Sequence, residues 1–294
     1  MNGLTELLFQ LFHALGQWLL TPFFYVAVLL IAWRNVRLAQ TERQMFHLRL
    51  HAPVHQTVRQ LLEGLAAGFI LSGLLLALGV VLQPSAFGWL WALALLLFLL
   101  RRRWMPPVFA VGLLWLASGV VSWLPAPGAD GNWQEALSGI HWPAWLALVG
   151  FLQWWEAWLL RRFARRQAYP LVLDGRRGRP IGGYRLEGWW PLPLLVWSPG
   201  LEGAGWDPLV SWWPLLADGA AGWVVVPLPL YGGFSVMSRT ALPEAQAAWW
   251  QRRRWLGGLI AITLAALGQG WSSFAGVGMC LFLVWELGVT AAWA

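Results

Sequence analysis

Long apolar stretches separated by clusters of arginine restrict what this chain can fold into. About seven of them approach the roughly 20 mostly apolar residues that a helix needs to cross a bilayer. They lie at about residues 17–33, 64–83, 86–100, 105–124, 143–160, 255–271 and 273–292. Only 11% of the residues are charged, against about 25% in ordinary soluble domains. The pattern predicts an all-α polytopic membrane protein with about seven transmembrane helices.

The arginines predict the orientation of these helices, because Arg-rich loops stay in the cytoplasm. We interpret the arginines that flank the apolar stretches as membrane-interface residues: Arg34, Arg37, Arg43, Arg49, Arg101, Arg102, Arg103, Arg161, Arg162, Arg165, Arg166, Arg252, Arg253 and Arg254. The loop at 125–142 carries Asp130 and Glu135 and no basic residue. A single topology then places every arginine inside, with the N-terminus outside, seven crossings and a cytoplasmic C-terminus. Anionic lipid accounts for the positive charge, so we expect no nucleic-acid partner.

Three regions follow from this pattern. Residues 1–166 form an N-terminal membrane region of about five helices, 167–254 a cytoplasmic or interfacial subdomain, and 255–294 a C-terminal pair of membrane helices. Within the first region, residues 34–62 are expected to form a cytoplasmic amphipathic segment along the membrane. Pro53 should kink or break that segment, because proline removes a helical hydrogen bond.

The region 167–254 is rich in Gly, Pro and Trp and is expected to be partly β. Its first part, "YPLVLDGRRGRPIGGYRLEG", predicts two strands joined by a turn around "DGRRG". "WWPLPLLVWSPG" contains three prolines and is too short to span a membrane, and "GWVVVPLPLYGG" is typical of a strand or a re-entrant segment. The expectation is a subdomain that lies against the membrane. A buried hairpin that crosses it twice stays open as an alternative.

Two sets of ionisable residues could indicate function. His47, His51 and His55 would share one face of a continuous helix and could bind zinc, but Pro53 interrupts that helix and no nearby Asp, Glu or Cys completes a ligand set. We therefore expect interfacial histidines and no metal. Glu156 and Glu286 lie in apolar stretches, where a carboxylate is costly and is by default a functional hypothesis. They support an alternative function as a permease or channel subunit.

No enzymatic motif is complete. Ser235 and His141 could suggest a hydrolase, but Ser235 lacks a nucleophile elbow and the predicted topology places His141 across the membrane. "WEAWLLRR" is similar to the motif of paired-glutamate membrane proteases, without the second glutamate or the metal-binding histidines. The glycines of "GRRGRPIGG" do not lie between a strand and a helix as a phosphate loop requires. One cysteine, Cys280, excludes an internal disulfide framework. We expect neither enzymatic activity nor a cofactor.

Four sequence blocks together resemble one family. The first is "LTPFFYVAVLLIAWRNVRLAQTERQMFHLRLH" at 20–51, an apolar helix followed by "ERxxFHxR". The others are "DGRRGRPIGGYRLEGWWPLPLLVWSPG" at 174–200, "DPLVSWWPLLADGAAGWVVVPLPLYGGFSVMSRTALPEAQ" at 207–246 and "VWELG" at 284–288. In these blocks the chain resembles the MinJ family, membrane-bound topological determinants of cell division in Gram-positive, rod-shaped bacteria. The block with "GRRGxxIGG" and "WxxPL" is the most specific.

The resemblance implies a non-enzymatic scaffold in the bacterial cell membrane, at septa and poles. Such a scaffold links a coiled-coil protein that senses negative curvature, DivIVA, to the division inhibitor MinD, so a DivIVA-like coiled coil and a MinD-like ATPase are the expected partners beside the lipid bilayer. The family carries a cytoplasmic PDZ domain after its last membrane helix. This sequence stops at Ala294, where that domain would begin, so the expectation is that it is lacking. The resemblance carries over no individual contact residue.

Overall fold

The computed structural model describes residues 3–47, 52–100, 107–122, 137, 139–164, 168–174, 180–200, 213–217, 222–238 and 242–291. These residues form eight α-helices and three β-strands. The helices are α1 (Gly3–Leu20), α2 (Pro22–Phe46), α3 (Pro53–Leu78), α4 (Ser85–Leu100), α5 (Pro107–Val121), α7 (Trp142–Phe163), α8 (Pro243–Gly270) and α9 (Ser272–Ala291). The strands are β1 (Ala168–Asp174), β2 (Pro180–Pro199) and β3 (Trp223–Ser238).

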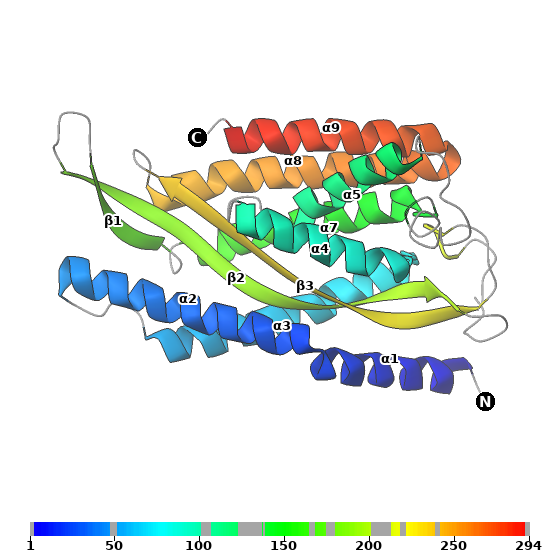
Figure 1. Ribbon diagram of the computed structural model, residues 1–294, viewed down its shortest axis with the longest axis horizontal. Helices are drawn as coiled ribbons and strands as arrows, with labels where there is room; N and C mark the ends of the chain where they lie inside the picture. Colours follow the sequence, from blue (N-terminus) through cyan, green and yellow to red (C-terminus); the bar gives the residue numbers. More distant parts are fainter. Residues whose placement is uncertain are drawn as a thin grey trace.

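A long pair of strands, which we call the central ribbon, consists of β2 and β3. The sheet is antiparallel in the order β1-β2-β3. β1 pairs with the beginning of β2 only, whereas β2 and β3 pair from Tyr184↔Ser238 to Pro199↔Trp223. Figure 1 shows the ribbon along the long axis of the molecule, with α1, α2 and α3 on one side and α7, α8 and α9 on the other. Residues 186–198 of β2 are all buried.

The prolines in the middle of β2 occupy positions whose N–H group would point away from β3, toward an edge without a neighbouring strand. The Leu195 N–H donates to Ser72 Oγ at 2.9 Å and the Trp197 N–H to the Val80 carbonyl at 3.3 Å, so both point away from β3. Alternate residues of a strand direct their N–H groups to the same edge, which places the nitrogens of Pro191 and Pro193 on this edge too. Proline has no N–H to leave unsatisfied there.

The outer edge of β3 follows the same rule. The Val225 N–H donates to Gln10 Oε1 of α1 at 3.3 Å. Pro227 and Pro229 lie two and four residues further along β3, and the register pairs Pro229 with Pro193. The middle of the ribbon therefore presents few N–H donors at either outer edge, and helices can enclose it without burying unpaired donors.

Small residues let α3 approach β2 closely. Gly64, Gly68 and Ser72 are spaced four residues apart, so they share one face of the helix. A Cβ at Gly64 would lie 2.9 Å from Pro191 Cδ, and one at Gly68 would lie 2.9 Å from Pro193 N, closer than real Cβ atoms come. Ser72 Oγ also donates to the Pro193 carbonyl at 3.0 Å. The helix thus contacts the strand through its backbone.

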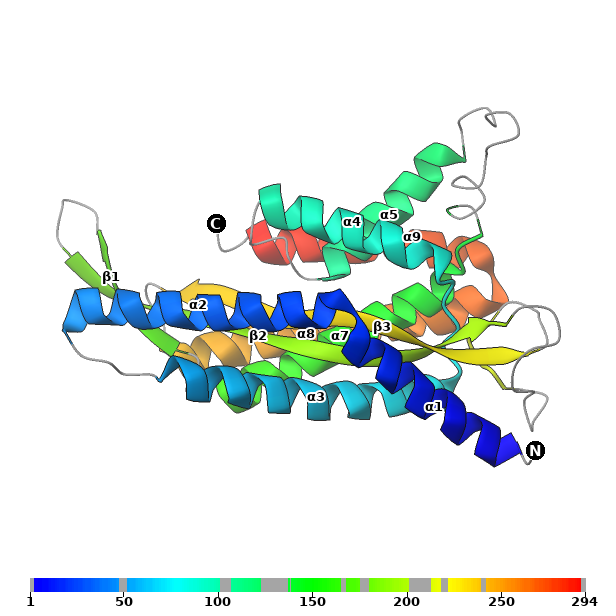
Figure 2. The same cartoon turned by 60° about the horizontal axis from the view of Figure 1, so that its bottom comes forward.

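The core lies around α7, which is buried on almost every side. α7 and α8 run antiparallel in Figure 1 and meet at two glycines, where a Cβ on Gly150 would lie 3.0 Å from the Gly258 carbonyl oxygen. The main apolar cluster joins these helices to α3, α4, α5 and the ribbon. Figure 2 shows α1 crossing the far end of the ribbon, where Ala14 packs with Trp197 and Trp223 in a second cluster.

The predicted all-α fold with seven crossings is wrong. The apolar stretches do form helices, but within the described residues only Pro22–Met45 and Pro53–Leu78 are long and apolar enough to cross a membrane. α4 and α5 are too short to cross a membrane, and protein covers α7 on almost every side. The apolar sequence of α7 therefore matches a helix in a protein core. The strands are also part of the interior of the fold. Hydropathy reports that a segment avoids water, but it does not report whether lipid or protein surrounds that segment.

Two local predictions are confirmed. β1 and β2 form the expected hairpin, with Asp174 paired to Pro180. Pro53 interrupts the helix, because α3 begins there and α2 ends with His47 in the left-handed conformation at φ 55°. The structure shows no boundary near residue 34, since α2 is continuous from Pro22 to Phe46.

Candidate functional site

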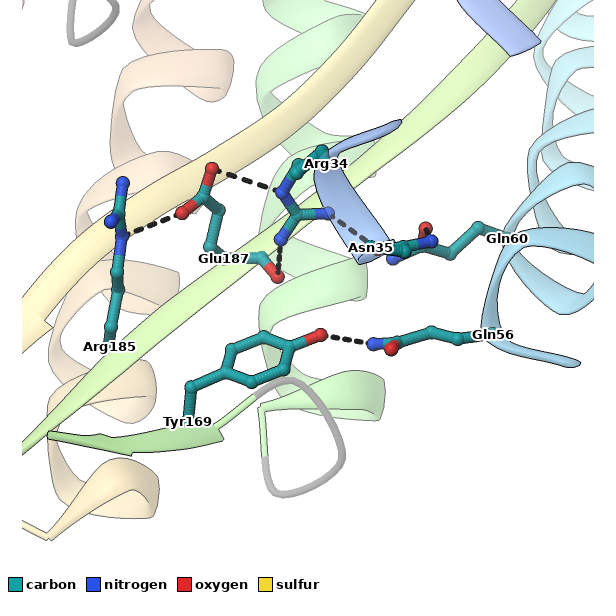
Figure 3. A network of polar contacts seen from close by, with 7 residues as sticks. All are labelled: Arg34, Asn35, Gln56, Gln60, Tyr169, Arg185 and Glu187. Carbon is teal, nitrogen blue, oxygen red and sulfur yellow. Dashed lines mark hydrogen bonds and ion pairs between the residues drawn. The ribbon is translucent and has the colours of Figure 1, made fainter. Parts of the chain in front are cut away.

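A buried polar network joins α2 and α3 to the strands, and we call it the Arg34–Glu187 network (Figure 3). Arg34 Nε donates to Glu187 Oε1 at 3.0 Å, and Arg34 Nη2 donates to the Glu187 backbone carbonyl at 2.5 Å. Arg185 Nε binds the second carboxylate oxygen at 2.6 Å. Arg34 and Glu187 are both buried. Burying charges costs free energy unless they are paired and hydrogen-bonded, and the Glu187 carboxylate has a cationic partner on each oxygen.

Amide side chains extend this network to α3 and β1. Asn35 Nδ2 donates to Thr57 Oγ1 at 3.0 Å and to Gln60 Oε1 at 2.9 Å. Gln56 Nε2 donates to the Tyr169 hydroxyl. The network therefore links α2, α3, β1 and β2 through side chains (Figure 3). Its geometry suits a clamp that holds the β1–β2 hairpin against the helices.

A second buried cluster, the Arg254 cluster, joins α7, α8 and α9. Arg254 Nε lies 3.3 Å from Glu156 Oε2, and Arg254 Nη1 donates to Glu286 Oε2 at 2.8 Å. Gln153 Nε2 donates to the other oxygen of Glu286. All four side chains are buried. One arginine thus holds two carboxylates from different helices.

Glu156 is the group in this cluster that can exchange a proton near neutral pH. Burial raises its pKa to about 7, against the opposing attraction of Arg254 and with a further contribution from the negative charge of Glu286. Glu156 Oε1 and Gln153 Oε1 are buried without a hydrogen-bond partner. α7 lies outside the two helices that are long and apolar enough to cross a membrane. Protonation would convert the carboxylate of Glu156 from an acceptor only into a group that can also donate.

The structure separates the predicted interface arginines into two classes. Arg34 and Arg254 are buried in the ion pairs above. The exposed ones are Arg37, Arg43, Arg161, Arg162 and Arg252. Arg253 is half-buried, with its guanidinium 3.7 Å from the centroid of the Trp249 ring. Arg49, Arg101, Arg102, Arg103, Arg165 and Arg166 lie outside the described residues.

The structure brings together residues that sequence reasoning treated separately or missed. Glu156 and Glu286 were candidates for a transport path, and both bind Arg254. Glu187 and Asn35 were not candidates at all. A carboxylate beside tryptophans in "RLEGWW" was a signal for a buried charge, but its partner Arg34 is 153 residues away.

The alternative sites remain separate in the structure. Ser235 is exposed on β3, whereas His141 is buried at the beginning of α7. His47 caps α2 and His55 lies in α3, while His51 and the residues 175–179 of the glycine-rich turn lie outside the described part. Within the described part of the chain, no group of three His, Cys, Asp or Glu side chains could hold a metal ion. The absence of enzymatic activity stays a prediction.

The outward faces of α2 and α3 are apolar. In the most apolar part of α2 only 28% of the residues are buried, and in that of α3 only 33%. The core helix of a soluble protein is, by contrast, mostly buried. Leu29 of α2 is 68% exposed and Ile70 of α3 is 75% exposed. Contiguous apolar surface of this kind marks an interaction with a membrane or with protein.

Comparison with known proteins gives one informative similarity. The chain is 26% identical over 279 residues to the cell division topological determinant MinJ of Bacillus subtilis (strain 168), across 94% of this chain and 68% of MinJ. No protein-family model matches the chain, and no solved structure matches it. These findings support a MinJ-like relationship over almost the whole sequence.

Proposed function

We propose that this chain is a membrane-associated, non-enzymatic scaffold that acts in the placement of the division site. The observation that carries the proposal is the similarity to MinJ, which extends over 94% of the chain. That protein is named a topological determinant of cell division. The two buried polar clusters support a structural role, because their charged groups are engaged in ion pairs between helices and strands.

The exposed apolar faces of α2 and α3 support an anchor in the membrane. Figure 1 shows the end of α2, the start of α3, the end of α7 and the start of α8 at the same end of the molecule. Exposed arginines lie in these helix ends, among them Arg43, Arg161 and Arg252. Because positive residues stay inside, this basic end faces the cytoplasm, and α2 and α3 are the helices that cross.

A basic cytoplasmic end is where soluble division proteins would bind. The resemblance implies a DivIVA-like coiled coil and a MinD-like ATPase as partners, and their attachment would place the chain at septa and poles. The Arg34–Glu187 network supports this role, because it ties the β1–β2 hairpin to α2 and α3 and would restrict its motion. A rigid surface loses less conformational entropy when a partner binds.

A fluorescent fusion in a Gram-positive rod tests the proposal. We expect a membrane signal that is enriched at septa and poles and becomes uniform when the DivIVA-like protein is deleted. A signal throughout the cytoplasm would contradict the membrane anchor. A uniform membrane signal in the presence of the DivIVA-like protein would contradict the role in site placement.

The permease or channel alternative is tested by the same fusion. Double substitution of Glu156 and Glu286 by Gln removes both carboxylates of the Arg254 cluster. A scaffold of matched abundance should keep its septal position in this variant. Loss of a solute flux with retained position would favour the transport function instead.

A further inference from the structure

The end of α7 and the first half of α8 line an open hollow of about 580 Å³. Figure 1 shows these two helix segments at the basic end of the molecule. Arg161 at the end of α7 lines one side, and residues from the first half of α8 line the rest. Those residues are Ala248, Gln251, Arg252, Trp255 and Leu256. The hollow therefore combines two arginine side chains with a mainly apolar wall.

The two arginines of the hollow form no ion pair with a residue that the structure describes. Among the described residues, Arg34, Arg59, Arg185 and Arg254 each form an ion pair with a glutamate, but neither Arg161 nor Arg252 does. Both side chains are exposed. Arginine presents a fork of N–H donors that matches the oxygens of phosphate. The charge of the hollow is complementary to an anion of that geometry.

The apolar wall continues along α8 away from the arginines. Leu256 and Leu259 are each 51% exposed, and Ile260 is 38% exposed. Residues at this spacing follow one face of a helix. Trp255 is partly exposed beside them, and tryptophan favours the boundary between headgroups and hydrocarbon. A ligand that fits has an anionic head and a long apolar tail.

We infer that this hollow binds one anionic phospholipid, with the phosphate of its headgroup between Arg161 and Arg252 and an acyl chain along Leu256 and Leu259. This inference rests on the membrane association in the proposed function, but not on the role in division. The bound lipid would fix the end of α7 and the start of α8 at the depth of the headgroups. It would also make attachment depend on the anionic lipid content of the membrane.

Native mass spectrometry of the full chain in detergent tests the site, with phosphatidylglycerol and phosphatidylcholine as probes. Wild type should retain a phosphatidylglycerol molecule and lose phosphatidylcholine. The double variant Arg161→Gln, Arg252→Gln should bind phosphatidylglycerol at least about tenfold more weakly, because two charge-assisted hydrogen-bonding groups are lost. The matched control is Arg37→Gln, Arg43→Gln, which removes two exposed arginines from α2 and should bind like wild type.

Three outcomes would overturn the inference. Equal weakening in the control variant would mean that only the overall positive charge attracts the lipid. Displacement of the lipid by inorganic phosphate at a similar concentration would mean that the hollow is a site for free anions. Unchanged phosphatidylglycerol binding in the Leu256→Ser variant would show that the acyl chain does not contact this wall. The two proposals can fail separately. Selective binding of phosphatidylglycerol together with a uniform membrane signal of the fluorescent fusion would refute the division role alone.

Discussion

Substitution of Gly68 by alanine tests whether close contact between α3 and the prolines of β2 holds the fold together. The added methyl group would lie 2.9 Å from Pro193 N and closer still to Pro193 Cδ and Cγ, whereas ordinary contact begins at 3.4 Å. These atoms belong to a proline ring in a buried strand and cannot rotate away. The helix would have to withdraw by roughly 1 Å to restore normal contact.

The groups that move determine how much folding free energy Gly68→Ala loses. Overpacking of a buried position costs about 1–3 kcal/mol. Ser72, one turn further along α3, would also lengthen the hydrogen bond that it accepts from the Leu195 N–H, which is worth about 1 kcal/mol. The better helix propensity of alanine offsets about 1 kcal/mol. The net destabilisation of Gly68→Ala is therefore about 2 kcal/mol.

Gly73→Ala is the matched control on the same helix, because a Cβ at Gly73 meets nothing within 4 Å. It should stabilise the protein by up to about 1 kcal/mol through helix propensity alone. Thermal unfolding of purified protein in detergent, followed by tryptophan fluorescence, should place the melting temperature of Gly68→Ala several degrees below that of Gly73→Ala. Equal melting temperatures for the two variants would refute the close-contact argument.

Two further predictions concern the buried charges. Glu187→Ala should destabilise the protein by about 3–5 kcal/mol, because it leaves Arg34 buried without its carboxylate. In the same unfolding assay, the double variant Arg34→Met, Glu187→Ala should recover part of that lost stability. No recovery would argue against a stabilising Arg34–Glu187 ion pair. The raised pKa of Glu156 means that the folded protein binds a proton more tightly than the unfolded chain, so its contribution to stability is complete below about pH 4.5 and is lost as the pH rises to about 7. Glu156→Gln should flatten the pH dependence of the melting temperature across this window, and an unchanged slope would assign the dependence to another group.

Much of the local structure could be predicted from the sequence. The turn residues of "DGRRG" between two strand-like segments predict the β1–β2 hairpin from local sequence alone, and the two strands pair as expected. Pro53 starts α3, because a proline suits the first turn of a helix and cannot continue an earlier one. The low charge content also indicated extensive apolar surface, which the exposed faces of α2 and α3 carry. These properties depend on a residue and its near neighbours.

The arrangement of these pieces was decided by tertiary structure. The seven apolar stretches look alike as sequences, yet α7 is covered by protein and α3 exposes an apolar face. From the sequence, "WWPLPLLVWSPG" was too short to span a membrane and "GWVVVPLPLYGG" was a strand or a re-entrant segment. Only the paired register shows that both belong to one ribbon, with the proline nitrogens on its outer edges.

The candidate sites depended on tertiary structure even more strongly. Arg34 at the end of an apolar stretch indicated a side chain that reaches a headgroup, and nothing local to it points to Glu187. Arg254 likewise belongs to a run of three arginines in the sequence, and only the packing of α7, α8 and α9 distinguishes it from Arg252. The sequence by itself determined which segments avoid water and where the chain turns. Tertiary structure decided which charges are paired, because an ion pair depends on the distance in space between two residues and these partners are far apart in the chain.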